Sequence, residues 1–181
     1  MHTAAVLPRP QDRTFSNPQL TALVVLRMLI GWHLLYEGLV KLFNPYWTAA
    51  NYLAESRGLL SGMFHTWSSN PGIMGVVDFI NIWGLIIVGL ALVVGFMTRE
   101  ATIAGIALLA LYYLAAPPLL GFTYSMPPEG SYVIVNKVLI ELAALTVVAL
   151  LPTSNIIGLD RLRQRGRGAR AGDHGSEEDH G

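Results

Sequence analysis

Cysteine is absent from the 181-residue sequence, and charged residues are scarce. The lack of cysteine excludes disulfides, iron–sulfur clusters, thiolate metal sites and any thiol relay carried by this chain. Charged residues make up 13% of the chain, against roughly 25% in soluble domains. Hydrophobic residues make up 52% and fall into long runs separated by short polar segments. This pattern is typical of a helical membrane protein rather than of a soluble domain.

Four apolar runs predict membrane-spanning helices. They cover residues 20–43, 76–96, 101–116 and 132–151. Prolines follow the first, third and fourth runs closely, and proline cannot continue a helix. We therefore expect an all-α membrane protein whose core is a four-transmembrane-helix bundle.

Basic residues outside the runs predict the orientation of the bundle. Arg9, Arg13, Arg99 and the five arginines between positions 161 and 170 would share one side of a four-span bundle, opposite Arg57. Because cytoplasmic loops are enriched in lysine and arginine, both termini are expected to be cytoplasmic. The expected location is a bacterial or archaeal cytoplasmic membrane.

The chain is expected to divide into three parts. Residues 1–19 form an N-terminal cytoplasmic segment, residues 20–162 the membrane domain, and residues 163–181 a charged C-terminal tail. The tail is rich in glycine, arginine and acidic residues, a composition typical of disorder. Its histidines, His174 and His180, are interpreted as solvated rather than as metal ligands.

The connection between the first two runs, residues 44–75, contains Trp47, Tyr52, Phe64 and Trp67. Because tryptophan and tyrosine favour the headgroup layer, we interpret it as an interfacial segment with a short helix near residues 52–57. An ordinary exposed loop is the alternative. Small residues in the second and third runs, at spacings such as Ala91/Gly95 and Ala101/Gly105, predict close helix packing.

Ionisable and polar residues interrupt the apolar runs, although each charge at the centre of a spanning helix costs about 2.5–3.5 kcal/mol on insertion scales. They should therefore face one another or a water-filled cavity. With cytoplasmic termini, all except the deeper Arg27 would gather in one pocket that opens outward. The candidate pocket residues are Arg27, His33, Glu37, Lys41, Asp78, Asn81, Tyr112, Tyr113, Asn136, Lys137 and Glu141.

Helical spacing makes neighbours of several of these side chains. His33 to Glu37, Glu37 to Lys41, and Lys137 to Glu141 are all i,i+4 steps. Two interpretations remain open. The cluster could lock the helices together without binding anything, or it could bind a ligand or a redox partner.

The known chemistries of membrane helices narrow the choice of ligand. A bis-histidine haem needs two buried histidines, and only His33 lies inside a run. The repeated Glu-x-x-His of di-iron bundles and the glycine-rich loops of nucleotide enzymes are absent, and no metal site or nucleic-acid partner is expected. A quinone head group is a suitable ligand, because it needs donors to two carbonyls, a proton path and apolar walls.

Five stretches of this sequence carry a family resemblance. They are residues 27–41 (RMLIGWHLLYEGLVK), residues 78–84 (DFINIWG), Thr98-Arg99, residues 129–141 (EGSYVIVNKVLIE) and residues 152–161 (PTSNIIGLDR). Over residues 20–162 the chain resembles the DoxX/DoxD family of small four-helix membrane proteins. The resemblance implies a role beside the respiratory chain. DoxD-type members are associated with thiosulfate:quinone oxidoreductase, and other members with stress-linked membrane complexes. The family carries over no established catalytic residue.

Three functional hypotheses follow. The first is an integral membrane subunit of a quinone-linked oxidoreductase, acting on sulfur compounds such as thiosulfate, with no covalent cofactor. The second is a non-catalytic anchor or organising subunit of a larger respiratory or stress-response complex. The third is a small-anion transporter that uses Arg27 and Lys137 as counter-charges. The expected partners are the lipid bilayer, a quinone, and either another protein or further copies of the chain.

Overall fold

A computed structural model describes residues 16–119, 124, 133–151, 153 and 157–160. These residues form six helices and no strand. The helices are α1 (Asn17–Phe43), α2 (Ala50–Ala54), α3 (Ser61–Ser68), α4 (Pro71–Val94), α5 (Thr98–Ala115) and α6 (Lys137–Leu150). The expectation of an all-helical chain is confirmed for this part of the molecule. The predictions for the first 15 residues and for the charged tail fall outside it.

Two of the helices, α1 and α4, are long and apolar enough to cross a membrane. Only 28% of the most apolar window of each helix is buried within the chain. The core helix of a soluble protein would be buried mostly by its own chain. Large apolar side chains such as Leu29, Phe79 and Ile87 are instead more than 60% exposed, as expected where lipid is the neighbour.

Helix boundaries differ from the expected runs by up to five residues, and the capping residues explain the differences. The Asn70 side chain accepts hydrogen bonds from the amides of Gly72 and Ile73, so α4 begins at Pro71 rather than at residue 76. It ends at Val94 because Gly95 adopts the left-handed conformation. Asn136 caps α6 through the Leu139 amide, so that helix begins at Lys137 rather than at residue 132.

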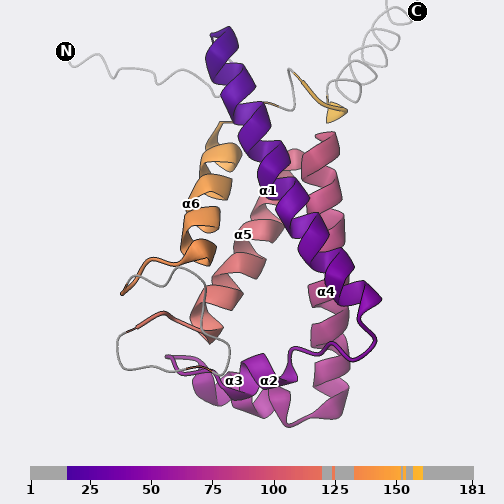
Figure 1. The fold of residues 1–181 in the computed structure, drawn as a ribbon, viewed down its shortest axis with the longest axis vertical. Coiled ribbons are helices and arrows are strands. Elements are labelled where there is room, and N and C mark those ends of the chain that lie inside the picture. Colours follow the sequence, from indigo (N-terminus) through magenta and orange to yellow (C-terminus); the bar gives the residue numbers. More distant parts are fainter. Residues whose placement is uncertain (1–15, 120–123, 125–132, 152, 154–156, 161–181) are drawn as a thin grey trace, which may run out of the picture.

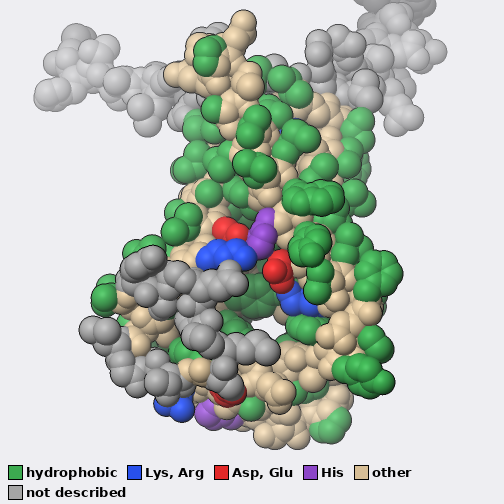
Figure 2. Space-filling model, in the orientation of Figure 1, with side chains coloured by type: hydrophobic (Ala, Val, Ile, Leu, Met, Phe, Trp, Pro, Cys, Tyr) green, Lys and Arg blue, Asp and Glu red, His purple; other side chains and the backbone are tan. Residues whose placement is uncertain are grey.

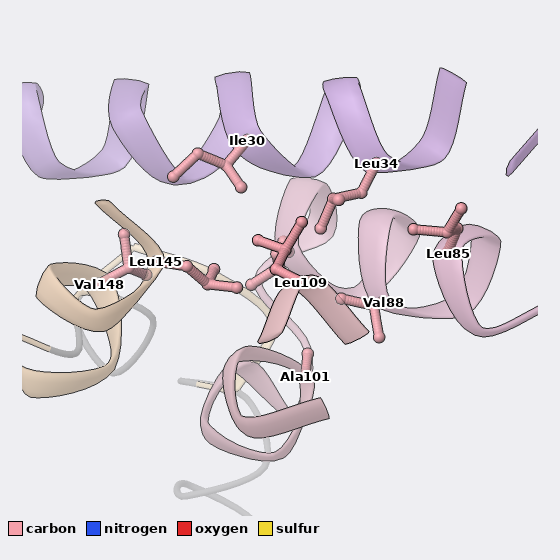
Figure 3. Close-up of a cluster of buried hydrophobic side chains, with 9 residues drawn as sticks. Ile30, Leu34, Leu85, Val88, Ala101, Leu109, Leu145 and Val148 are labelled. Carbon is pink, nitrogen blue, oxygen red and sulfur yellow. The ribbon is translucent and has the colours of Figure 1, made fainter. Parts of the chain in front are cut away.

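The four longer helices run along the molecule, and α2 and α3 lie across one end (Figure 1). The beginning of α1 and the end of α6 lie at the other end. Helix α1 packs mainly on α4, and α5 packs on α6 and α4. The main core lies between these helices and draws side chains from all four of them (Figure 3). It consists of Ile30, Leu34, Leu85, Val88, Leu92, Ala101, Leu109, Leu145 and Val148.

Glycines allow α1 and α4 to approach closely. A Cβ atom added at Gly89 would lie 2.4 Å from the backbone nitrogen of Leu35, and one at Gly31 would lie 2.9 Å from the backbone nitrogen of Val93. Gly38 is equally tight, with 2.9 Å to the backbone nitrogen of Ile86. Gly105, one of the predicted small-residue positions, allows α5 to approach α6 closely, because a Cβ atom added there would lie 2.7 Å from the Leu145 side chain.

The α2–α3 segment has a small core of its own. Ala49, Leu53, Phe64, Met74 and Ala115 are buried together, and the Phe64 and Trp67 rings meet edge to face at 5.7 Å. The alternative of an ordinary exposed loop is therefore wrong. The expected single helix near residues 52–57 is also corrected: α2 ends at Ala54, and α3 is a second helix. Helices α2 and α3 are too short for their apolar residues to show a clear helical period, so the sequence did not predict α3.

At the opposite end, Arg27, Thr153, Ile157 and Asp160 form a cluster that we call the terminal clasp. Arg27, only 2% exposed, donates to the Ile157 carbonyl at 3.0 Å and to Thr153 Oγ1 at 3.4 Å. The Asp160 carboxylate accepts from the amides of Met97 and Thr98 at 2.8 and 3.2 Å. A carboxylate at the amino end of α5 also interacts favourably with the helix dipole.

Candidate functional site

Five ionisable side chains from α1 and α6 form one group, which we call the charged cluster: His33, Glu37, Lys41, Lys137 and Glu141. Figure 2 shows basic, acidic and histidine side chains gathered on one face of the molecule, between its hydrophobic upper half and the α2–α3 end. His33 Nε2 lies 3.1 Å from Glu141 Oε1, and Lys41 Nζ lies 3.0 Å from Glu37 Oε2. Lys137 lies within electrostatic reach of both carboxylates.

Lys41 is held from two sides. It pairs with Glu37 one helical turn earlier on α1, and its ammonium lies 5.5 Å from the centroid of the Trp47 ring. A cation over an aromatic face gains cation–π attraction. The lysine side chain is 15% exposed and that of its glutamate partner 42%. Glu37 is thus the more accessible member of the pair.

The contact between His33 and Glu141 joins the first long helix to the last. It is an ion pair when the imidazole is protonated, and otherwise a hydrogen bond. The charges of Glu37 and Glu141 are already balanced by Lys41 and Lys137.

A cavity of about 390 Å³ lies between α2, α3, α4 and α5. Its lining is largely apolar, with Tyr52, Asn81, Tyr112 and the Trp67 indole as the polar exceptions. Asn81 approaches the Tyr112 hydroxyl, but without the geometry of a hydrogen bond. Neither the Asn81 Oδ1 atom nor this hydroxyl has a hydrogen-bond partner in the described structure. Tyr112 is also within electrostatic reach of Glu37, so the cavity adjoins the charged cluster.

Tyr52 closes one side of this cavity. Its hydroxyl donates to the Tyr112 carbonyl at 2.9 Å, and the two rings meet edge to face. The residue is 43% exposed, but desolvation of its hydroxyl raises the pKa of Tyr52 to about 12. The hydroxyl is therefore neutral at physiological pH.

Four further predicted pocket residues have hydrogen-bond partners outside the charged cluster. The Asp78 carboxylate accepts a hydrogen bond from the Ala49 amide at 2.9 Å, and so ties the α2–α3 segment to α4. Asn136 is the cap of α6, and the Tyr113 hydroxyl donates to the Ile134 carbonyl. Arg27 belongs to the terminal clasp, ten residues before Glu37 and therefore roughly 15 Å away along α1. These four side chains bind backbone groups.

Three comparisons bear on the identity of the chain. The family model named DoxX matches residues 22–118, more than half of the sequence. A search of curated proteins and a search of solved structures each gave no match. The matched region includes most of α1 and all of α4 and α5, and with them the glycine contacts between α1 and α4, the cavity and the α1 part of the charged cluster. The chain is an integral membrane protein that belongs to the DoxX family.

Proposed function

We propose that this protein is a membrane subunit of a quinone-linked oxidoreductase and that the charged cluster exchanges protons with the quinone head group. The observation that carries the proposal is the meeting of two carboxylates, two ammonium groups and one imidazole between α1 and α6. A cluster of this kind within apolar helices marks a proton or substrate site by default.

The side chains present suit a quinone head group. Lys41 and His33 can donate hydrogen bonds to its two carbonyl oxygens, and Glu37 and Glu141 can deliver or accept protons. Reduction of a quinone to a quinol consumes two electrons and two protons. The electrons would come from a donor such as thiosulfate, since two thiosulfate ions lose one electron each on forming tetrathionate. The role of the chain would be to bind the head group and supply the protons.

The proposal includes four membrane spans, α1, α4, α5 and α6, with both termini in the cytoplasm. Helices α5 and α6 are shorter than α1 and α4, at 18 and 14 residues, or roughly 27 and 21 Å at 1.5 Å per residue. Their packing beside the two longer helices supports their inclusion. The position of Arg99 at the clasp end supports the orientation, because basic loops favour the cytoplasm.

Cysteine labelling tests this topology without background, because the natural chain contains no cysteine. We expect Ser69→Cys, on the exposed turn between α3 and α4, to react with a membrane-impermeant maleimide in intact cells. Glu100→Cys, exposed at the start of α5, should react only after permeabilisation. The opposite pattern would reverse the orientation, and labelling of both sites in intact cells would contradict four spans.

Substitution of Glu37 tests the role of the charged cluster. We expect Glu37→Gln to lower thiosulfate-dependent reduction of decylubiquinone in membranes by about 10²-fold, the lower end of the range for general acid–base catalysis. Quinone extracted from the purified variant should match the wild type, because the amide retains hydrogen-bonding capacity. Glu100→Gln is the matched control, an exposed carboxylate outside the cluster.

Three results would decide against the proposal. The first is wild-type activity of the Glu37 variant with thiosulfate and with other electron donors. The second is the absence of quinone from the protein purified in mild detergent. The third is loss of activity on deletion of the chain while every cluster substitution is silent, which would favour an organising subunit.

A further inference from the structure

We infer that the cavity beneath α2 and α3 is a binding site for an uncharged, largely apolar molecule that carries one hydroxyl group. This site lies outside the charged cluster, and the inference does not depend on the proposed function. It rests on three properties of the cavity: its size, the character of its walls, and two buried polar atoms that lack partners.

The walls exclude a charged ligand. No Lys, Arg, His, Asp or Glu is among the described residues that line the cavity, which are Ala49, Tyr52, Leu53, Phe64, Trp67, Ile73, Val76, Val77, Ile80, Asn81, Leu108, Leu111, Tyr112 and Ala115. An isolated charge in such surroundings would lose its hydration without gaining a counter-ion. The occupant must therefore be neutral.

Water alone does not suit the space. The cavity measures about 390 Å³, whereas each molecule of liquid water occupies about 30 Å³ and needs two to four polar partners when buried. Two unpartnered atoms, Asn81 Oδ1 and the Tyr112 hydroxyl, cannot hold that many water molecules. A volume in this range is instead typical of pockets for small organic ligands.

The two unpartnered atoms specify the polar group of the ligand. Asn81, 8% exposed, has a carbonyl oxygen that only accepts, whereas the Tyr112 hydroxyl can donate. A ligand hydroxyl can donate to the first and accept from the second. A ligand carbonyl only accepts and leaves the Asn81 oxygen unpaired, and a plain hydrocarbon leaves both atoms unpaired. Compared with a ligand that pairs both atoms, a ligand that leaves one of them unpaired should bind roughly tenfold more weakly.

Two sources share this chemistry, an aromatic alcohol and a long-chain alcohol. The polar end of either would rest between Asn81 and Tyr112. Its apolar body would contact Leu108 and Leu111 of α5 and the aromatic side chains of α3. A ring and a chain differ in width, so the two classes can be separated by experiment.

The test measures the thermal unfolding midpoint of the full chain in lipid nanodiscs as a function of probe concentration. A ligand that binds the folded state raises this midpoint. The probes are 4-butylphenol and 1-decanol, each compared with a partner that lacks the hydroxyl, butylbenzene and decane. Partition of a probe into the lipid is the same for every variant, so it cancels when variants are compared.

We expect at least one hydroxyl probe to bind about tenfold more tightly than its hydrocarbon partner. Preference for 4-butylphenol would identify an aromatic ligand, and preference for 1-decanol a chain-like one. Asn81→Leu should remove the advantage of the hydroxyl while leaving hydrocarbon binding within about twofold, a difference of less than half a kcal/mol.

Two matched tryptophan substitutions on α4 distinguish filling of the cavity from a general loss of stability. Ile80 lines the cavity and Phe79 does not, and both are more than half exposed, so a larger side chain can be accommodated at either position. Ile80→Trp should abolish the midpoint shift, and Phe79→Trp should retain it. Equal binding of both hydroxyl probes and their hydrocarbon partners, or equal shifts in the two tryptophan variants, would overturn the inference. Glu37→Gln should leave the shift unchanged, which keeps this result separate from the proton-transfer proposal.

Discussion

Gly89→Ala should lower the free energy of unfolding by about 3 kcal/mol, the upper end of the usual cost of overpacking. The added methyl group would meet the backbone nitrogen of Leu35 at 2.4 Å and the carbonyl oxygen of Gly31 at 2.7 Å. Backbone atoms inside a helix cannot move aside as a flexible side chain can. Helix α1 would therefore have to separate from α4 along the length of their contact.

Gly75→Ala is the matched control, because it makes the same chemical change in the same helix. Nothing lies within 4 Å of a Cβ atom added there, and alanine favours a helix over glycine by about 1 kcal/mol. The control should therefore be neutral or stabilising. Unfolding midpoints in nanodiscs, supported by the yield of monodisperse protein, measure both effects. Similar midpoints for the two variants would contradict the close packing of α1 on α4.

Arg27→Leu should destabilise the protein by on the order of 3 kcal/mol, comparable to breaking a buried polar pair by removing one partner. The substitution preserves much of the side-chain volume but removes the donor that binds the Ile157 carbonyl and Thr153. It also removes the positive charge near Asp160. We expect Thr153 and Ile157 to lose their contact with α1 and the α4–α5 turn to become accessible to protease.

Two further arginine substitutions serve as controls for the predicted effect of Arg27→Leu. Arg99→Leu removes the same charge at the same end of the bundle from an exposed position, and should cost less than about 0.5 kcal/mol. Arg27→Lys keeps the charge but removes the Nη1 group that donates to both Thr153 and Ile157, and its unfolding midpoint should lie between those of the other two variants. Thermal unfolding midpoints and the rate of limited proteolysis measure the relative stabilities of the three variants. Equal midpoints for Arg27→Leu and Arg99→Leu would show that the clasp contributes no stability.

Regular spacing along one helix was readable from the sequence. The four-residue step from Glu37 to Lys41 predicted neighbours, and the structure pairs them. The step from His33 to Glu37 predicted the same, and the two lie within electrostatic reach of each other, but the direct partner of His33 is Glu141 on α6. Periodicity fixes which residues share a face of one helix, whereas it carries no information about the rotation of a second helix against that face.

Polar residues near helix ends were the least predictable part of the site. Asp78 and Asn136 were assigned to the pocket because both interrupt apolar runs. In the structure their side chains satisfy backbone amides, at Ala49 and Leu139 respectively. Aspartate and asparagine serve equally well as ligand-binding groups and as caps. Only the path of the neighbouring chain separates the two roles, and that path depends on the packing of α2 and α3.

The cavity could not have been derived from the sequence for the same reason. Asn81 and Tyr112 were recognised as intramembrane polar residues, but the space between them exists only because α2 and α3 cover the ends of α4 and α5. The aromatic residues of that segment predicted affinity for the membrane interface. Their packing into a second small core, around the buried Phe64 ring, depends on contacts between residues far apart in the chain.

The position of the terminal clasp has a consequence for biosynthesis. The glycine contacts between α1 and α4 use residues 31–93, so this hairpin can pair as soon as α4 has left the ribosome. Arg27 and the amino end of α5 must wait for Thr153, Ile157 and Asp160, which are made after the four long helices. Domains made first generally fold first. A buried guanidinium on α1 thus remains without its acceptors until all four long helices have been made, and a nascent chain stalled before residue 153 would expose it to quality control.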